Sequence, residues 1–296
     1  MTPAQPRLAS TVLSVAVLLV AMMSFQAGAS IAKSLFATVG AQGAVALRVG
    51  VGAVLLLIVF RPWRTRPTAV AWRSIIAYGI SLGVMNLFFY TALATIPLGV
   101  AVALEFSGPL AVAMMASRRP IDFLWIALAV GGLLMILRPT GAPGSALDPV
   151  GVACALGAGV CWALYIVFGQ KAGGEHGMHT TALGSAIAAI IVVPIGAVHA
   201  GAALLSPHVL LVGAAVGVLG TALPYALEMI ALTRLPARTF GTLMSLEPAV
   251  GALAGLVLLQ QRLTTPQWLA IAAVVAASIG ATATIRSKTP VVTTEL

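Results

Sequence analysis

Long apolar runs, separated by short polar breaks, follow one another along the 296 residues of the chain. No Asp, Glu, Lys or Arg occurs between Arg73 and Glu105, and none occurs between Glu175 and Glu228. The runs are continuous and do not alternate with period two, which predicts helices rather than strands. A helix of about 20 apolar residues spans a bilayer, so each of these two stretches is long enough for more than one crossing.

The positions of the breaks predict ten helical spans with short connections. A polar interval at 138–148, rich in proline and glycine, lies at the midpoint and is interpreted as a linker. We expect a first five-helix unit at 10–138, a linker at 139–149, a second five-helix unit at 150–286 and a disordered tail at 287–296. The predicted spans are 11–32, 43–60, 74–94, 98–117, 122–138, 150–170, 179–198, 208–233, 238–259 and 266–285.

The two units are related in sequence. A shift of 139 residues superposes Pro97 and Pro109 on Pro236 and Pro248. Five spans per unit is an odd number, so the second unit must enter the membrane upside down relative to the first. Inverted repeats of this kind build alternating-access carriers, whose binding sites lie near the midplane between the repeats. The expected fold is an all-α integral membrane protein with ten transmembrane helices in two inverted five-helix repeats.

Composition supports a membrane protein. The chain is 60% hydrophobic and only 8% charged, whereas a soluble domain carries about 25% charged residues. The net charge of +9 would also suit nucleic-acid binding, but the basic residues lie in short loops between apolar runs, so no nucleic-acid partner is expected. The segment Ala27-Gly28-Ala29 resembles a signal-peptidase site. We expect it to be retained, because the run continues to Lys33 and has a counterpart in the second unit.

The basic residues also predict the orientation of the chain. If the N-terminus is cytoplasmic, twelve Lys and Arg residues fall at cytoplasmic ends and three at the opposite side. This bias agrees with the positive-inside rule, so both termini are expected in the cytoplasm. The twelve are Arg7, Arg61, Arg64, Arg66, Arg73, Arg118, Arg119, Lys171, Arg234, Arg238, Arg286 and Lys288, and the three are Lys33, Arg138 and Arg262.

Glu105 is the first candidate for transport chemistry, because ionisable residues inside a membrane are costly and usually functional. Pro109 lacks the amide that would bond to the carbonyl of Glu105, which predicts a helix break here. A carboxylate beside a freed backbone acceptor suits a cation or proton site. The alternative is a structural role, in which Glu105 pairs with Arg48 or Lys33 to hold two helices together.

Two further carboxylates lie in the second unit. Glu247 precedes Pro248 and is the approximate counterpart of the Glu105 region, so it is either a second cavity carboxylate or part of a structural kink. Glu228 lies nearer the cytoplasmic end, where it is either functional or a partner for Arg234 or Arg238.

The remaining candidates are cations, polar residues and aromatics. Arg48 lies well inside a span and either clamps a substrate carboxylate or neutralises a glutamate. Lys33 either snorkels to the interface or ends a polar series on the first span that includes Gln26. The other candidates for a cavity wall or binding site are Phe25, Asn86, Phe88, Phe89, Tyr90, Trp162, Tyr165 and Tyr225.

Other functional classes have little support. Cys154 and Cys161 lie about 10 Å apart along a helix, too far for a disulfide, and no cofactor or metal site is expected. Glu175, His176 and His179 resemble a metal site only weakly. Neither a zinc-protease motif, paired aspartates nor a serine-hydrolase elbow is present, so an enzyme is not expected. A structural or sensory membrane subunit is a second alternative, which differs from a carrier in giving no flux in vesicles.

Five stretches of the sequence resemble one family. They are VAMMSFQAGASIAKSLF (20–36), FRPWR (60–64), IPLGVAVALEFSGPLAVA (96–113), ALGAGVCWALYIVFGQKAG (155–173) and TALPYALEMIALTRLPARTFGTLMSLEPA (221–249). They are similar to the bacterial threonine and homoserine exporters of the drug/metabolite transporter superfamily, whose members carry paired EamA domains.

This resemblance covers residues 10–286 and implies ten helices, a central cavity and proton-driven efflux of hydrophilic amino acids across the bacterial inner membrane. It supplies no established set of site residues. The expected partners are a small amino-acid substrate and membrane lipid, with the chain a monomer or homodimer. The alternative cargo is another polar metabolite or a drug exported within the same superfamily. For a zwitterionic amino acid, Glu105 or Glu247 would accept the substrate ammonium or a proton, and Arg48, Lys33 or a helix N-terminus would receive the substrate carboxylate.

Overall fold

The computed structural model describes residues 5–64, 67–116, 120–137, 147–176, 178–234, 240 and 243–284. Within these residues the chain is helical and contains no strand. The elements of the first half are α1 (Gln5–Ser34), α2 (Phe36–Phe60), the 3₁₀ turn η1 (Pro62–Arg64), α3 (Ala69–Thr95), α4 (Leu98–Glu105), α5 (Ser107–Ala116) and α6 (Pro120–Leu137). Those of the second half are α7 (Pro149–His176), α8 (Met178–Ala200), the 3₁₀ turn η2 (Gly201–Leu205), α9 (Pro207–Gly217), the π-helix η3 (Val218–Ala222), α10 (Leu223–Arg234), α12 (Glu247–Leu258) and α13 (Thr265–Thr284).

The helices follow the predicted spans closely, because continuous apolar runs are the strongest signal in this sequence. The second helix is the main difference. It begins at Phe36 instead of residue 43, and Gly40 interrupts it with a left-handed φ of +70°, a conformation that glycine adopts without steric cost. The predicted loop is therefore mostly helical. Most of the predicted linker (139–146 of 139–149), residues 238–239 and 241–242 of the ninth span, and the predicted tail lie outside the described residues.

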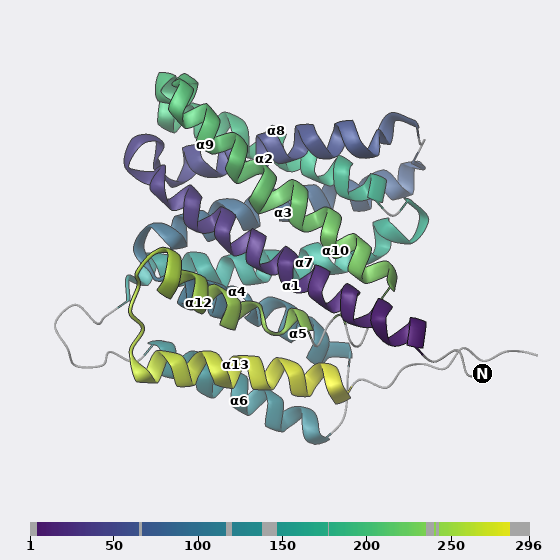
Figure 1. The fold of residues 1–296 in the computed structure, drawn as a ribbon, viewed down its shortest axis with the longest axis vertical. Coiled ribbons are helices and arrows are strands. Elements are labelled where there is room, and N and C mark those ends of the chain that lie inside the picture. The colour runs from purple at the N-terminus through teal and green to yellow at the C-terminus, as the bar shows by residue number, and fades with distance from the viewer. Residues whose placement is uncertain are drawn as a thin grey trace, which may run out of the picture.

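The helices run roughly alongside one another and stack in layers (Figure 1). At one end of the stack α2 packs on α8, and at the other α6 packs on α13. Between them α3 packs on α7, α1 packs on α9, η3 and α10, and α4 packs on α12 and α7. Elements of the two halves therefore contact each other throughout the bundle. The start of α1 and the end of α13 lie at the same end of it (Figure 1).

The surface of the bundle is apolar. Large hydrophobic side chains are exposed on many helices, including Val59 at 66%, Phe123 at 74% and Leu211 at 73%. Six described helical segments are long and apolar enough to cross a membrane, and four shorter apolar helices accompany them. Backbone groups in lipid must be satisfied within their own segment, and helices meet that condition. The chain is thus a multi-pass, all-helical membrane protein.

Candidate functional site

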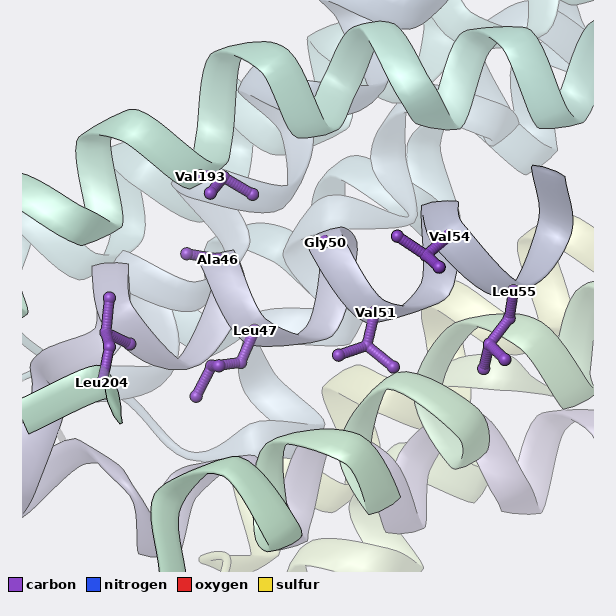
Figure 2. A pocket seen from close by; sticks show the side chains of 8 residues that line it. All are labelled: Ala46, Leu47, Gly50, Val51, Val54, Leu55, Val193 and Leu204. Carbon is purple, nitrogen blue, oxygen red and sulfur yellow. The ribbon is translucent and has the colours of Figure 1, made fainter. Parts of the chain in front are cut away.

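A groove with a volume of about 340 Å³ runs along α2 (Figure 2). It is lined by Ala46, Leu47, Gly50, Val51, Val54, Leu55, Val193 and Leu204. None of these side chains carries a hydrogen-bond donor or acceptor. A zwitterionic or strongly polar ligand would lose its hydration here without replacement, so the polar site must lie elsewhere.

Two interrupted helices place polar groups inside the bundle. Between α4 and α5 the helix breaks at Phe106, and before α12 it breaks at Ser245 and Leu246. In both cases a proline, Pro109 or Pro248, follows in the first turn of the next helix, where its missing amide is tolerated. The break predicted from Pro109 is therefore present. Irregular backbone at membrane depth occurs where it is buried in protein or lines a cavity.

A glutamate stands at each break. Glu105 is the last residue of α4 and is 6% exposed, and Glu247 is the first residue of α12 and is 5% exposed. Because α4 packs on α12, the two carboxyl groups lie within electrostatic range of each other and of Arg48. Sequence spacing alone places them 142 residues apart, and the fold brings them together.

Gln26 on α1 joins this acidic pair. Its Nε2 donates to Oε1 of Glu247 at 3.3 Å, and its side chain is fully buried. Its Oε1 is buried without a hydrogen-bond partner among the residues described. Gly251, one turn after Glu247 on α12, leaves room beside the amide, since a β-carbon there would lie 3.5 Å from Cδ of Gln26.

Arg48 is almost fully buried, at 1% exposure, and it donates both to the backbone and to a side chain. Nε and Nη2 donate to the carbonyl oxygen of Gly220 on η3, at 3.1 and 2.7 Å. Nη1 donates to Oδ1 of Asn86 on α3 at 3.0 Å, and Asn86 in turn donates to the carbonyl of Leu82 at 2.8 Å. Pro224, four residues after Gly220, has no amide hydrogen that could bond to this carbonyl. Arg48 supplies donors in its place.

Aromatic rings enclose the guanidinium of Arg48. Its Cζ lies 4.5 Å from the ring centroid of Phe25 and 5.3 Å from that of Tyr90, positions that favour cation–π attraction. The arginine is therefore held by α1, α2, α3 and η3 at once. Its hydrogen bonds go to a carbonyl and an amide rather than to a carboxylate, although two carboxyl groups lie within electrostatic range.

A second polar group lies beside the first. Tyr78 on α3 and Tyr165 on α7 stack with ring centroids 4.6 Å apart. Glu228 on α10 is half-buried and within electrostatic range of both tyrosines, of Tyr225 and of Glu247. This group extends the polar interior along α10, from η3 toward Arg234.

The other predicted site residues fall in different places. Trp162 on α7 meets Phe106 at the α4–α5 break edge to face, with centroids 5.5 Å apart. Lys33 lies in the last turn of α1, seven residues beyond Gln26 and thus about 10 Å further along the axis. It stands apart from the acidic pair. Within the described parts of the chain, no group of three His, Cys, Asp or Glu residues could hold a metal ion.

Sequence reasoning missed Tyr78 and Gly220. Tyr78 carries a signal, since it is a buried tyrosine in a charge-free run, but nothing distinguishes it from a packing residue. Gly220 takes part through its main-chain carbonyl, and its signal in the sequence is Pro224, which lacks the amide that would bond to that carbonyl. Asn86 was predicted as a substrate contact, and the structure places its side chain on Arg48.

Comparison with known proteins gives a family match for the second half of the chain and a shared fold. Residues 149–283 match the EamA-like transporter family. A crystal structure of a protein with 19% sequence identity shares the fold, with a TM-score of 0.57 over 93% of this chain and 98% of that one. The chain therefore shares the fold of that crystal structure.

Proteins with similar sequences identify the group of transporters to which the chain is related. The threonine/homoserine exporter RhtA of Salmonella typhimurium is 58% identical over 93% of this chain and 92% of its own. The protein of the same name from Escherichia coli strain K12 is 56% identical over 94% of each chain. The uncharacterized transporter YwfM of Bacillus subtilis is 28% identical over 80% of this chain. The chain belongs to the EamA-like transporter family, within the group of the threonine/homoserine exporters. The predicted resemblance is confirmed, and these relatives are transporters rather than enzymes.

Proposed function

We propose that this protein exports threonine, homoserine and similar small hydrophilic amino acids from the cytoplasm by proton antiport. The names of relatives that are 56–58% identical over more than nine-tenths of the chain support the cargo. One structural observation carries the mechanism: two buried glutamates, Glu105 and Glu247, stand at the breaks of two helices that pack on each other.

The proposed architecture has ten membrane crossings in two inverted five-helix repeats. The helix pairings support it, since the main contacts between the halves have counterparts when the halves are exchanged. The contact of α3 with α7 corresponds to that of α1 with α9, η3 and α10, while α2 with α8, α4 with α12 and α6 with α13 each correspond to themselves. A twofold relation of this kind would place the breaks near the midplane, where carriers bind their substrates.

The proposed location is the bacterial inner membrane, with both termini in the cytoplasm. The positive-inside bias of the loops supports this orientation. The common position of the α1 start and the α13 end is consistent with it (Figure 1).

Coupling follows from competition at the two carboxyl groups. A carboxylate in this apolar interior binds either a proton or the substrate ammonium, but not both together. The carrier binds substrate from the cytoplasm and releases it on the opposite side of the membrane. A proton then binds the emptied carboxyl group while the carrier returns to its inward-facing state. The exchange of one for the other links export to the proton gradient.

The substrate carboxylate needs a separate donor set. All three Arg48 nitrogens with hydrogen-bond partners face Gly220 and Asn86, so Arg48 is better suited to hold the bundle together than to clamp a ligand. The first turns of α5 and α12 begin inside the bundle and offer backbone N–H groups with a favourable dipole. We assign the carboxylate to this region.

Reconstituted vesicles test the proposal. Vesicles loaded with labelled threonine should release it faster when a proton gradient is imposed inward, and Glu105→Gln or Glu247→Gln should remove the acceleration. Asp148→Asn serves as the matched control, because it makes the same isosteric change at the start of α7, outside the site. This variant should keep the acceleration of threonine release by the proton gradient. Equal release from loaded vesicles with and without the wild-type protein would contradict the proposal.

A further inference from the structure

A third hydrogen-bond acceptor, Gln26, lies beside the acidic pair of Glu105 and Glu247. The arrangement of these groups indicates which ligand group they would bind. Gln26 lies between α4 and α12, because the space beside Gly251 is bordered by both the Gln26 amide and Val102. Val102 is one turn before Glu105 on α4, and Gly251 is one turn after Glu247 on α12. The amide therefore lies beside the contact of α4 with α12, within one helical turn of each glutamate along its own helix, and it bonds directly to Glu247.

The hydrogen bonds of Gln26 leave one atom available. Nε2 donates to Glu247, which fixes the amide so that Oε1 points away from that contact. Oε1 is fully buried, and the described residues offer it no partner. An unpaired buried carbonyl is unfavourable, so it is retained where a ligand or water supplies a donor.

The three groups share one property, which is that they accept hydrogen bonds. Arg48, the buried cation within electrostatic range of the acidic pair, uses three of its five N–H bonds on Gly220 and Asn86. A ligand that satisfies this set must bring several N–H donors and a positive charge. A primary ammonium group, with three N–H bonds and one charge, meets three acceptors from three different helices.

We propose that Gln26 is a ligand-binding and specificity-determining residue, whose Oε1 accepts one N–H of the substrate's primary ammonium while Glu105 and Glu247 accept the others. This inference rests on the proposed function and deepens it. It predicts selection for primary over N-methylated amino acids, because each methyl group removes one donor and adds volume at the acceptors. An N,N-dimethylated amino acid retains one N–H bond, which the carboxylates take.

Binding to purified protein in detergent tests the assignment. Labelled threonine gives the Kd directly, and N,N-dimethylthreonine is measured by competition. Wild type should bind threonine the more tightly. In Gln26→Met, which keeps length but removes the acceptor, the Kd for threonine should rise about 10-fold or more, whereas the Kd for the dimethylated compound should stay within about twofold, so the discrimination shrinks.

Controls separate this role from a structural one. Gln260→Met makes the same change at an exposed glutamine whose Nε2 bonds only to the carbonyl of Val257, and it should alter neither Kd. A structural role for Gln26 would weaken both ligands by the same factor, and that result would overturn the proposal. So would equal affinity of wild type for both ligands.

A second variant covers misfolding. If Gln26→Met does not fold, Gln26→Glu provides the test. This variant retains an acceptor oxygen and should keep the preference for threonine. Loss of that preference would overturn the assignment. Failure of wild type to bind threonine at all would instead reject the proposed cargo. The two failures are therefore distinguishable.

Discussion

The carbonyl oxygen of Gly220 on η3 accepts two hydrogen bonds from Arg48 on α2, from Nη2 at 2.7 Å and from Nε at 3.1 Å. These bonds tie the one π-helical segment found among the described residues to the neighbouring helix. A bidentate guanidinium and a displaced carbonyl fit each other in shape as well as charge. The contact explains why a cation is tolerated at this depth in an apolar bundle.

Arg48→Lys should destabilise the protein. A lysine ammonium cannot reproduce the fork that holds Gly220 and Asn86 together, so at least one buried acceptor is left unpaired. We expect the free energy of unfolding to fall by about 2–3 kcal/mol, measured by denaturant unfolding in detergent. Arg262→Lys, at an exposed loop position, should have no measurable effect. Equal stability of Arg48→Lys and wild type would show that the double hydrogen bond contributes little.

Gly28→Ala should also destabilise, through backbone crowding. A β-carbon at Gly28 would lie 2.6 Å from both Cα and N of Gly220, and rigid backbone cannot move aside as a flexible side chain can. The expected loss is about 1–3 kcal/mol. Gly131→Ala on α6 is the matched control, since nothing lies within 4 Å of its β-position. Alanine also favours a helix over glycine by about 1 kcal/mol. If Gly131→Ala lowered the free energy of unfolding as much as Gly28→Ala, the packing argument would be wrong.

Asp148 caps α7 and gives the protein a pH-dependent contribution to stability. Its Oδ2 accepts from the amide of Gly151 at 2.8 Å, and this bond, with a smaller contribution from the Thr95 side chain, lowers the pKa of the carboxyl below its ordinary 3.8. A lowered folded-state pKa means that the stabilisation is present above the unfolded pKa and disappears as the pH falls through the folded one.

Asp148→Ala should therefore be less stable than wild type at pH 7, and the difference should shrink as the pH drops below about 4. Asp148→Asn keeps a good capping residue and should lose less stability at pH 7. Thermal unfolding across the pH range measures both. A difference between wild type and Asp148→Ala that is constant from pH 7 to pH 3 is incompatible with this cap.

Much of the fold was predictable because lipid imposes a simple rule on sequence. Apolar runs long enough to span the membrane mark the helices, and Pro109 marks the break beside Glu105. The start of α2 was not predictable, because residues 36–42 lie between two predicted spans and Gly40, with its positive φ, makes the turn within a segment that is otherwise helical.

The site was predictable in its residue types and not in its contacts. Buried Glu105, Glu247, Arg48 and Gln26 stand out as polar residues in apolar runs. The bond between Gln26 and Glu247 spans 221 residues of sequence, and Arg48 on α2 reaches a main-chain carbonyl 172 residues away. Pro224 marks that carbonyl as free of its helical partner, but no pattern in the sequence pairs either donor with its acceptor.

Labelling of single cysteines tests the proposed topology. In a background with Cys154→Ala and Cys161→Ala, a cysteine at Gln5 or at Thr284 should resist a membrane-impermeant maleimide in intact cells and react after permeabilisation. A cysteine at Arg262, in the exposed loop between α12 and α13, should react in intact cells. Labelling of Gln5 and Thr284 from opposite sides would contradict an even number of crossings.

The exchange of threonine for protons at Glu105 and Glu247 is tested most directly by following protons. With a pH-sensitive dye inside vesicles at equal pH on both sides, an outward threonine gradient should acidify the lumen in wild type. Glu105→Gln and Glu247→Gln should abolish the acidification. Outward threonine movement through the wild-type protein without any change of lumenal pH would contradict proton antiport.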